Sequence, residues 1–220
     1  MSPGIIWAGG YTSGIYQINK KNLSAKYFSS SAFAGEKSDR PDQYIRDIKK
    51  DSSGRIWAGG YNNLKCFDLK NNTIQQYTGP SAITSIIEKD SAHLWIGTIK
   101  GLYLIEKESG NYQYIEMPVE STHIYTLHQT NDTLYIGTAG AGLLVYQFSK
   151  KLFTRYTTNN SALTSNNIYT ILPHSKGYLI LGTANSITQF YPEKNLFHNW
   201  TKEHGLMSCL LYTSPSPRDS

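Results

Sequence analysis

The stretch DSSGRIWAGG at residues 51–60 decides the fold of this chain. Its second half has two hydrophobic residues, a small residue and then two glycines. Phrases of two hydrophobic residues, a small or aliphatic residue, Gly, and then Gly or Thr return at residues 6–10, 94–98, 134–138 and 179–183. The first glycine of each phrase stands at residue 9, 59, 97, 137 or 182, so successive copies lie 50, 38, 40 and 45 residues apart. A period of roughly 40–45 residues is typical of the blades of a β-propeller.

Each phrase has the same surroundings. A second apolar stretch follows it, and then a more polar stretch that ends in an aromatic residue. An alternating stretch precedes every phrase except the first, and Ile-Tyr-Thr-Ile at residues 168–171 is its clearest copy. Alternation with a period of two predicts strands with one buried face, so each repeat is expected to form a four-stranded antiparallel blade. The glycine is expected where neighbouring backbones approach closely.

The predicted fold class is therefore all-β: a β-propeller fragment with four complete four-stranded blades and one partial blade. Residues 1–208 are assigned to this fragment, and the first blade lacks its leading strand because its phrase begins so close to Met1. No segment has a helical stripe, so no helix longer than about two turns is expected. The predicted blades are residues 4–28 (partial), 44–77, 82–115, 123–156 and 167–200.

Composition excludes several classes of protein. Lys and Arg number 21 against 16 Asp and Glu, and the resulting charge of +5 is spread along the chain. A nucleic-acid partner is not expected, because such binders show a clustered basic stripe. Cys66 and Cys209 form neither a disulfide framework nor a metal knuckle, and no pair of the six histidines has metal-binding spacing. No metal and no cofactor is therefore expected, and Gly137-x-x-Gly140-x-Gly142 lacks the following helix that a phosphate site needs.

Residues 209–220 are predicted to be a non-native tail. The run from Cys209 to Asp219 matches, residue for residue, one reading frame of a transposase mosaic-end sequencing adapter, and it shares nothing with the repeat. It resembles a library scar and is left out of fold reasoning; a disordered tail is the alternative. We expect the residues from about Cys209 onward not to pack into the propeller.

The repeat resembles that of the two-component regulator propeller family. The resemblance lies in Asp-x-x-Gly-x-Ile-Trp-x-Gly at residues 51–59 and in its copy at residues 90–102. The family lead-in, Gly-Leu-small-Asn-x-aliphatic, is echoed at residues 163–168 and 205–208. The chain departs from the pattern at Ile180, where an aromatic residue is expected, and in two blades that carry Gly-Gly in place of Gly-Thr.

This resemblance implies a ligand-sensing propeller module of a hybrid histidine kinase receptor, one that responds to glycan-derived ligands and has no enzymatic activity of its own. It implies a periplasmic location, as part of an inner-membrane receptor, with kinase, receiver and DNA-binding regions beyond the C-terminal end. The expected partners are an oligosaccharide ligand, the remaining blades of the same chain and, in the full receptor, a second copy in a homodimer.

Two alternatives stay open: an extracytoplasmic propeller enzyme acting on polysaccharide, as a glycosidase or lyase, and a scaffold for protein–protein interaction. Glycoside hydrolysis needs two carboxylates about 5–10 Å apart. Asp51 and Asp90 occupy equivalent repeat positions, which favours a role in capping turns, so no catalytic residue is assigned. The scaffold stays open because a fold does not determine a function.

A ligand is expected on the rim that carries the loops between second and third strands and the loops between blades. Sugars need flat aromatic faces together with amide and charged hydrogen-bond partners. The long segment 29–43 adds to this rim, because long loops in compact folds are often functional. The candidate ligand-binding residues are Tyr11, Arg40, Asp42, Tyr61, Asn62, Lys100, His123 and Asn185.

Overall fold

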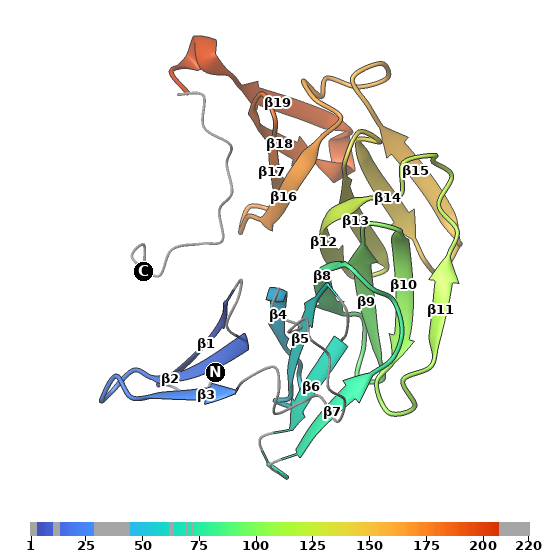
Figure 1. Cartoon of the computed structure of the whole chain (residues 1–220). Helices are drawn as coiled ribbons and strands as arrows, with labels where there is room; N and C mark the ends of the chain where they lie inside the picture. Colours follow the sequence, from blue (N-terminus) through green and yellow to red (C-terminus); the bar gives the residue numbers. More distant parts are fainter. Residues whose placement is uncertain are drawn as a thin grey trace. The chain divides into compact units, whose positions relative to one another are not determined.

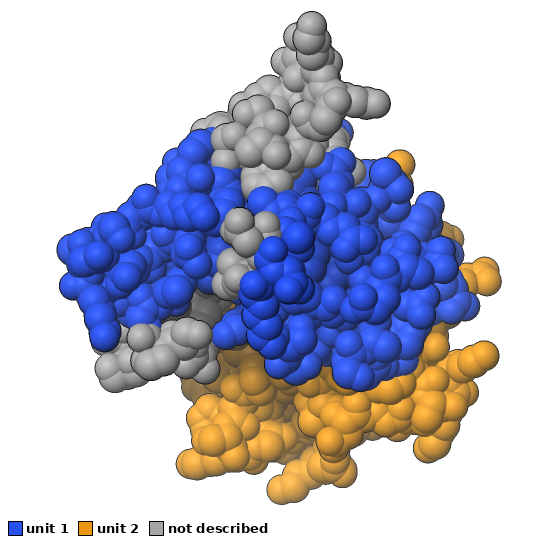
Figure 2. Space-filling model, turned by 90° about the horizontal axis from the view of Figure 1, so that it is seen from below, with its two compact units in different colours: residues 1–98, 103–115 blue, residues 99–102, 116–220 orange. Residues whose placement is uncertain are grey.

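The computed structural model describes residues 4–10, 14–28, 45–61, 64–68, 70–71 and 73–206. Within these residues the regular elements are antiparallel strands and two three-residue 3-10 helices (Figure 1). The chain divides into two compact units, one of residues 1–98 with 103–115 and the other of residues 99–102 with 116–220 (Figure 2). The expectation of no helix longer than two turns is confirmed for the described residues.

Three sheets, each a simple meander, belong to the first unit, apart from the first two residues of β10, Gly101 and Leu102, which belong to the second. The three-stranded sheet consists of β1 (Ile5–Gly10), β2 (Gly14–Asn19) and β3 (Ala25–Phe28). The next consists of β4 (Ile45–Lys50), β5 (Ile56–Gly60), β6 (Leu64–Asp68) and β7 (Thr73–Tyr77). The last consists of β8 (Ile83–Glu88), β9 (His93–Thr98), β10 (Gly101–Glu106) and β11 (Tyr112–Ile115).

The second unit contains two four-stranded meanders. One consists of β12 (Ile124–Thr130), β13 (Thr133–Thr138), β14 (Leu143–Gln147) and β15 (Leu152–Tyr156). The other consists of β16 (Ile168–Pro173), β17 (Leu179–Thr183), β18 (Ile187–Tyr191) and β19 (Leu196–Trp200). The 3-10 helices are Pro192–Lys194 and Lys202–His204. One three-stranded and four four-stranded sheets are the partial and complete blades that the repeat predicts.

The apolar core lies between neighbouring sheets, because a single blade cannot cover its own face. In the first unit, Trp57 of β5 packs in one buried cluster with Ile83 and Ile86 of β8. In the second unit, Tyr135 of β13 shares a cluster with Phe190 of β18. The aromatic and branched residues of the repeat therefore serve the packing of one sheet on the next.

The first glycine of the repeated phrase is required by this packing. A Cβ atom on Gly59 would lie 2.6 Å from Cγ2 of Ile83, the first residue of the next sheet. A Cβ atom on Gly9 would likewise lie 2.6 Å from Cγ2 of Ile45, the leading isoleucine of the next sheet. At Gly137 the nearest atoms would be Cγ2 of Thr126, at 2.6 Å, and the backbone oxygen of Ile168, at 2.7 Å. Close approach at the glycine is confirmed, and at Gly59 the approaching group is a side chain rather than the expected backbone.

We expect Gly59→Val to destabilise the chain by about 1–3 kcal/mol, because added methyl groups at a packed contact force neighbours apart. Urea unfolding followed by tryptophan fluorescence measures the change. Gln76→Val, which adds a branched residue at an exposed position of β7, is the control and should stay within about 0.5 kcal/mol of the starting chain. Equal midpoints for the two variants would contradict the packing role of this glycine.

Candidate ligand site on the loop rim

The structure describes four of the eight candidate ligand residues. Tyr11, Arg40, Asp42 and Asn62 lie outside the described residues. The other four stand at separate loops: Tyr61 after β5, Lys100 between β9 and β10, His123 before β12 and Asn185 between β17 and β18. Tyr61 is 57% exposed, Lys100 and Asn185 are exposed and His123 is half-buried.

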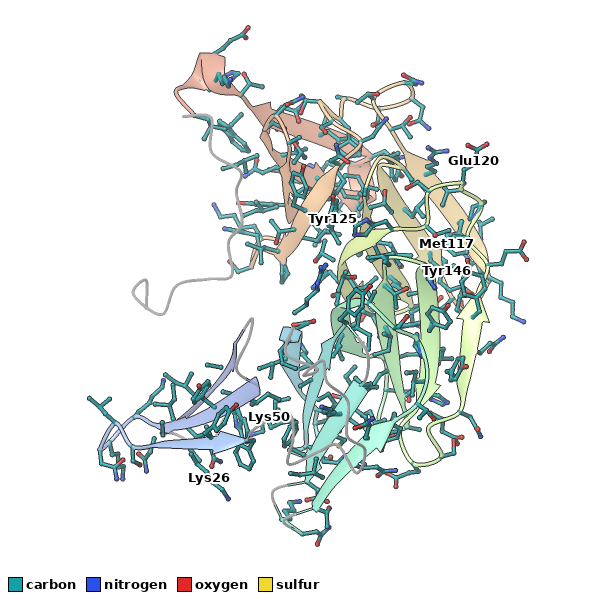
Figure 3. The ribbon with its side chains drawn as sticks, in the orientation of Figure 1. Lys26, Lys50, Met117, Glu120, Tyr125 and Tyr146 are labelled. Carbon is teal, nitrogen blue, oxygen red and sulfur yellow. The ribbon has the colours of Figure 1, made fainter. Side chains whose placement is uncertain are left out.

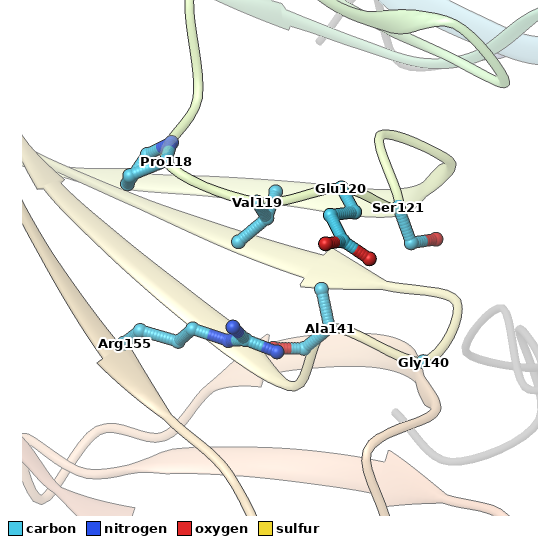
Figure 4. Close-up of a pocket in the computed structure, with 7 residues that line it drawn as sticks. All are labelled: Pro118, Val119, Glu120, Ser121, Gly140, Ala141 and Arg155. Atoms are coloured by element: carbon cyan, nitrogen blue, oxygen red, sulfur yellow. The ribbon is translucent and has the colours of Figure 1, made fainter.

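A hollow of about 550 Å³ lies on the second unit. Its walls come from the segment between β11 and β12, the turn between β13 and β14, and strand β15 (Figure 4). These include one loop between blades and one turn between second and third strands, the two kinds of loop on which a ligand is expected. The lining residues are Pro118, Val119, Glu120, Ser121, Gly140, Ala141 and Arg155.

The turn between β13 and β14, which lines the hollow and is called the floor turn below, is fixed by the threonine of the Gly-Thr phrase. The Thr138 hydroxyl donates to the Gly142 carbonyl at 2.7 Å and accepts from the Ala141 amide at 3.1 Å. In the next sheet the Ser186 amide donates to the Thr183 hydroxyl at 3.0 Å. The threonine therefore caps the turn between second and third strands, which gives this position of the repeat a physical role.

The segment that precedes β16 also holds this turn, through backbone hydrogen bonds to Asn166. The amides of Gly140 and Gly142 both donate to the Asn166 carbonyl, at 3.1 and 2.9 Å. The Asn166 side chain accepts from the Thr158 amide at 2.9 Å. A side chain at Gly142 is impossible, because its φ is +84° and a Cβ atom would collide with the carbonyl of Tyr156.

Two charged side chains face the hollow. The Arg155 Nε atom donates to the Ala141 carbonyl at 2.8 Å, which fixes the guanidinium at one wall. Figure 4 shows the Glu120 carboxylate extending into the same space from the opposite wall. Within the described residues neither group forms an ion pair with a protein side chain. The hollow therefore presents hydrogen-bond donors on one side and acceptors on the other.

A row of aromatic rings begins a few residues further along the same segment. The ring centroids of His123 and Tyr125 are 4.7 Å apart, and those of Tyr125 and Tyr169 are 4.9 Å apart. The three rings are half-buried, and the two tyrosines belong to β12 and β16. Figure 3 shows Tyr125 on the strand that follows the segment bearing Met117 and Glu120.

The acidic residues singled out as turn caps have that role. Asp51 accepts hydrogen bonds from the Ser53 hydroxyl at 2.7 Å and from the Trp57 indole at 2.9 Å. Asp90 accepts from the backbone amide of His93 at 2.8 Å and from its ring Nδ1 at 2.8 Å. Both carboxylates are thus engaged within their own turns.

These turn hydrogen bonds predict sensitivity to acid. Burial opposes ionisation of Asp51, but the hydrogen bonds from Ser53 and Trp57 outweigh it and hold the pKa well below its usual value. Burial likewise opposes ionisation of Asp90, yet its bond to His93 lowers the pKa to about 2. A depressed pKa stabilises the fold above the unfolded value of about 4, and this stabilisation is lost as the pH falls towards 2.

We therefore expect the urea midpoint to fall between about pH 4 and pH 2, and to fall less steeply in Asp51→Asn, which has no proton to gain. Unfolding curves at several pH values measure this. An equally steep fall in the variant would show that the acid sensitivity arises elsewhere.

Two further features are absent from the described part of the chain. No group of three or more His, Cys, Asp or Glu side chains there is placed to hold a metal ion. No helix among those residues is long and apolar enough to cross a membrane.

One family model matches part of the chain. Residues 39–62 match the two component regulator propeller model, and they include the stretch 51–60 that decides the fold. No curated protein matches the chain.

Solved structures resemble the chain over most of its length. The extracellular domain of a protein assigned as a one component system of B. thetaiotaomicron has a TM-score of 0.73 at 16% identity, over 91% of this chain and 30% of that one. An extracellular domain assigned to a hybrid two component system of the same organism has a TM-score of 0.73 at 18% identity, over 91% and 27%. The WD40 repeats of RRP9 have a TM-score of 0.74 at 10% identity, over 93% and 62%.

At these identities the likeness shows the fold alone, which is the β-propeller. The chain spans about 30% of the length of the first of these structures.

Proposed function

We propose that this chain, a β-propeller that carries a two component regulator propeller repeat, is a ligand-sensing module of a two-component signalling receptor. The observation that carries the proposal is the family match at residues 39–62, set within a fold shared with extracellular domains assigned to such systems. The module would lie outside the cytoplasm, in the periplasm, as part of an inner-membrane receptor. It would sense by binding, with the signal passed on by other parts of the receptor.

We propose further that the ligand is derived from a glycan and binds at the loop rim. The rim hollow supports this, because it offers the Arg155 guanidinium and the Glu120 carboxylate, the charged partners that hydroxyl groups bind. The aromatic row of His123, Tyr125 and Tyr169 adds half-buried ring faces close to the same segment. Aromatic faces and polar groups together are the usual contacts of a sugar.

Binding without catalysis is favoured over a propeller enzyme. A glycosidase needs two carboxylates about 5–10 Å apart on either side of its bond. Asp51 and Asp90, the acids repeated from blade to blade, are engaged by their own turns. Among the residues that line the hollow, Glu120 is the one carboxylate.

The test is calorimetric titration of the ectodomain that contains this chain with a panel of oligosaccharides, followed by chromatography of each mixture. We expect at least one oligosaccharide to bind and to be recovered uncleaved. Tyr61→Ala and Arg40→Ala, titrated in parallel, test two rim residues predicted from the sequence. Cleaved products would point to an enzyme, and a panel with no binding member would contradict the glycan ligand.

A further inference from the structure

We infer that the hollow between Glu120 and Arg155 binds the terminal residue of a neutral sugar through two neighbouring hydroxyl groups. This inference rests on the proposed function, because it specifies the chemistry of a glycan ligand at one place on the rim. Neither residue stands out in the repeat, and in the structure both line the same hollow, Glu120 from the loop before β12 and Arg155 from β15.

The hydrogen-bonding capacities of the two side chains carry the inference. A guanidinium can only donate, and an ionised carboxylate can only accept. A hydroxyl group does both, so one hydroxyl can accept from Arg155 while its neighbour donates to Glu120. Hydrogen bonds to charged groups are about twice as strong as neutral ones, so a pair of adjacent hydroxyls would be held firmly and in one orientation.

The charges in the hollow favour a neutral ligand. A sugar acid would suit Arg155 but would bring its carboxylate towards Glu120, and an amino sugar would bring its ammonium towards Arg155. Like charges brought together in a binding site oppose binding. A zwitterion as small as an amino acid would satisfy both charges, but the hollow of about 550 Å³ is in the range of sites for larger ligands.

The hollow is organised before any ligand arrives. The Arg155 Nε atom is already bonded to the Ala141 carbonyl, so its terminal NH2 groups remain for a ligand. The Ser121 hydroxyl donates to the Ala139 carbonyl at 2.6 Å and so ties the Glu120 segment to the floor turn. That turn is itself held by Asn166. Fixing a site in its binding geometry lowers the entropic cost of association.

The apolar lining indicates which part of the sugar is recognised. Pro118, Val119 and Ala141 line the hollow, and no aromatic ring does. Stacking on a flat ring is therefore absent from this site, and the hydroxyl-bearing edge of the sugar supplies the specific contacts. In this inference the hollow binds the hydroxyl-bearing edge of the sugar. Stacking of a sugar on a tyrosine ring, as predicted for Tyr11 and Tyr61, would occur elsewhere on the rim.

The experiment is calorimetric titration of the ectodomain that contains this chain with neutral, uronate-containing and amino-sugar oligosaccharides. Arg155→Gln and Glu120→Gln are compared with Lys150→Gln and Glu116→Gln, which remove the same charges at exposed residues that do not line the hollow. We expect a neutral oligosaccharide to bind and each hollow variant to weaken it at least about tenfold, the usual cost of losing a charged hydrogen bond. The controls should bind as the unchanged chain does.

A derivative of the bound sugar that lacks one of the two neighbouring hydroxyls should lose affinity in the unchanged chain, and much less in the variant that lacks the side chain binding that hydroxyl. A glycan that binds equally well to all variants would overturn this site and leave the proposed function standing. Tighter binding of the uronate or amino sugar would overturn the neutral class of ligand. A panel in which nothing binds would overturn this inference together with the glycan ligand on which it rests.

Discussion

Lys107→Ala is expected to lower the free energy of unfolding by about 3 kcal/mol, because it removes the buried counter-ion of Glu88 and one of the two cations beside Asp51. The Lys107 side chain is 1% exposed, and its Nζ atom lies 2.5 Å from Glu88 Oε1 and 3.5 Å from Asp51 Oδ2. The Asp51 side chain is fully buried. Arg55 also contacts Asp51, at 3.0 Å, so removal of Lys107 would leave Glu88 as the carboxylate without a cation.

The effect should be large because the lysine links two sheets. Glu88 ends β8 and also accepts from the amide and hydroxyl of Ser52, at 2.9 and 2.8 Å, in the β4–β5 turn of the preceding sheet. Tyr77 at the end of β7 donates its hydroxyl to the Lys107 carbonyl at 2.7 Å. One buried cation thus organises contacts between the second and third sheets.

Urea unfolding of Lys107→Ala against Lys150→Ala, an exposed lysine, measures this contribution. Lys107→Met, which keeps the length of the stem, separates loss of charge from loss of volume and should be nearly as damaging. A combined Lys107→Met and Glu88→Gln variant should recover part of the loss, since it removes the carboxylate that has lost its cation. Equal stability of Lys107→Ala and Lys150→Ala would contradict the role of the buried cation.

Trp57→Ala is expected to cost about 3–5 kcal/mol, the usual penalty for removing a large buried aromatic side chain. Trp57, on β5, is fully buried and belongs to a core cluster that includes Ile83 and Ile86 of the next sheet. Its indole also donates to Asp51 at 2.9 Å, so the substitution removes packing and a turn hydrogen bond together.

Thermal unfolding by circular dichroism measures the loss. Trp57→Phe keeps most of the packing and should lose less, and Trp200→Ala, at a residue 38% exposed, should lose less still. A penalty for Trp57→Ala no greater than that for Trp200→Ala would show that packing between these sheets contributes little.

The blades could be predicted because their signals are local and repeated. Alternation at residues 168–171 reflects strand periodicity, and the phrase at residues 51–60 reflects strand and turn preferences. Both patterns recur from blade to blade. The glycine at residue 59 was identified as a site of close approach, but the isoleucine that fills the space lies in the next repeat. A partner distant in sequence has no local signal.

The hollow could not be predicted for the same reason. Arg155 lies on an outer strand and Glu120 in a connection between blades, and both are exposed, as charged residues ordinarily are. Lys107 lies in a turn of polar residues, and nothing in the sequence around it predicts burial. Its side chain is buried because it contacts Asp51 and Glu88, which are distant in sequence. The tail from Cys209 lies outside the described residues, so its predicted lack of packing stays a prediction.

The most direct measurement of the central claim, that this chain is the sensory module of a signalling receptor, is the continuous genomic sequence of the locus read through residue 208. We predict that the adapter-like residues from Cys209 are absent there. In their place we expect further propeller repeats, then a membrane span and a histidine kinase or DNA-binding region. An uninterrupted gene that encodes the present tail and ends, or that continues into a polysaccharide-cleaving domain with no signalling region, would contradict the claim.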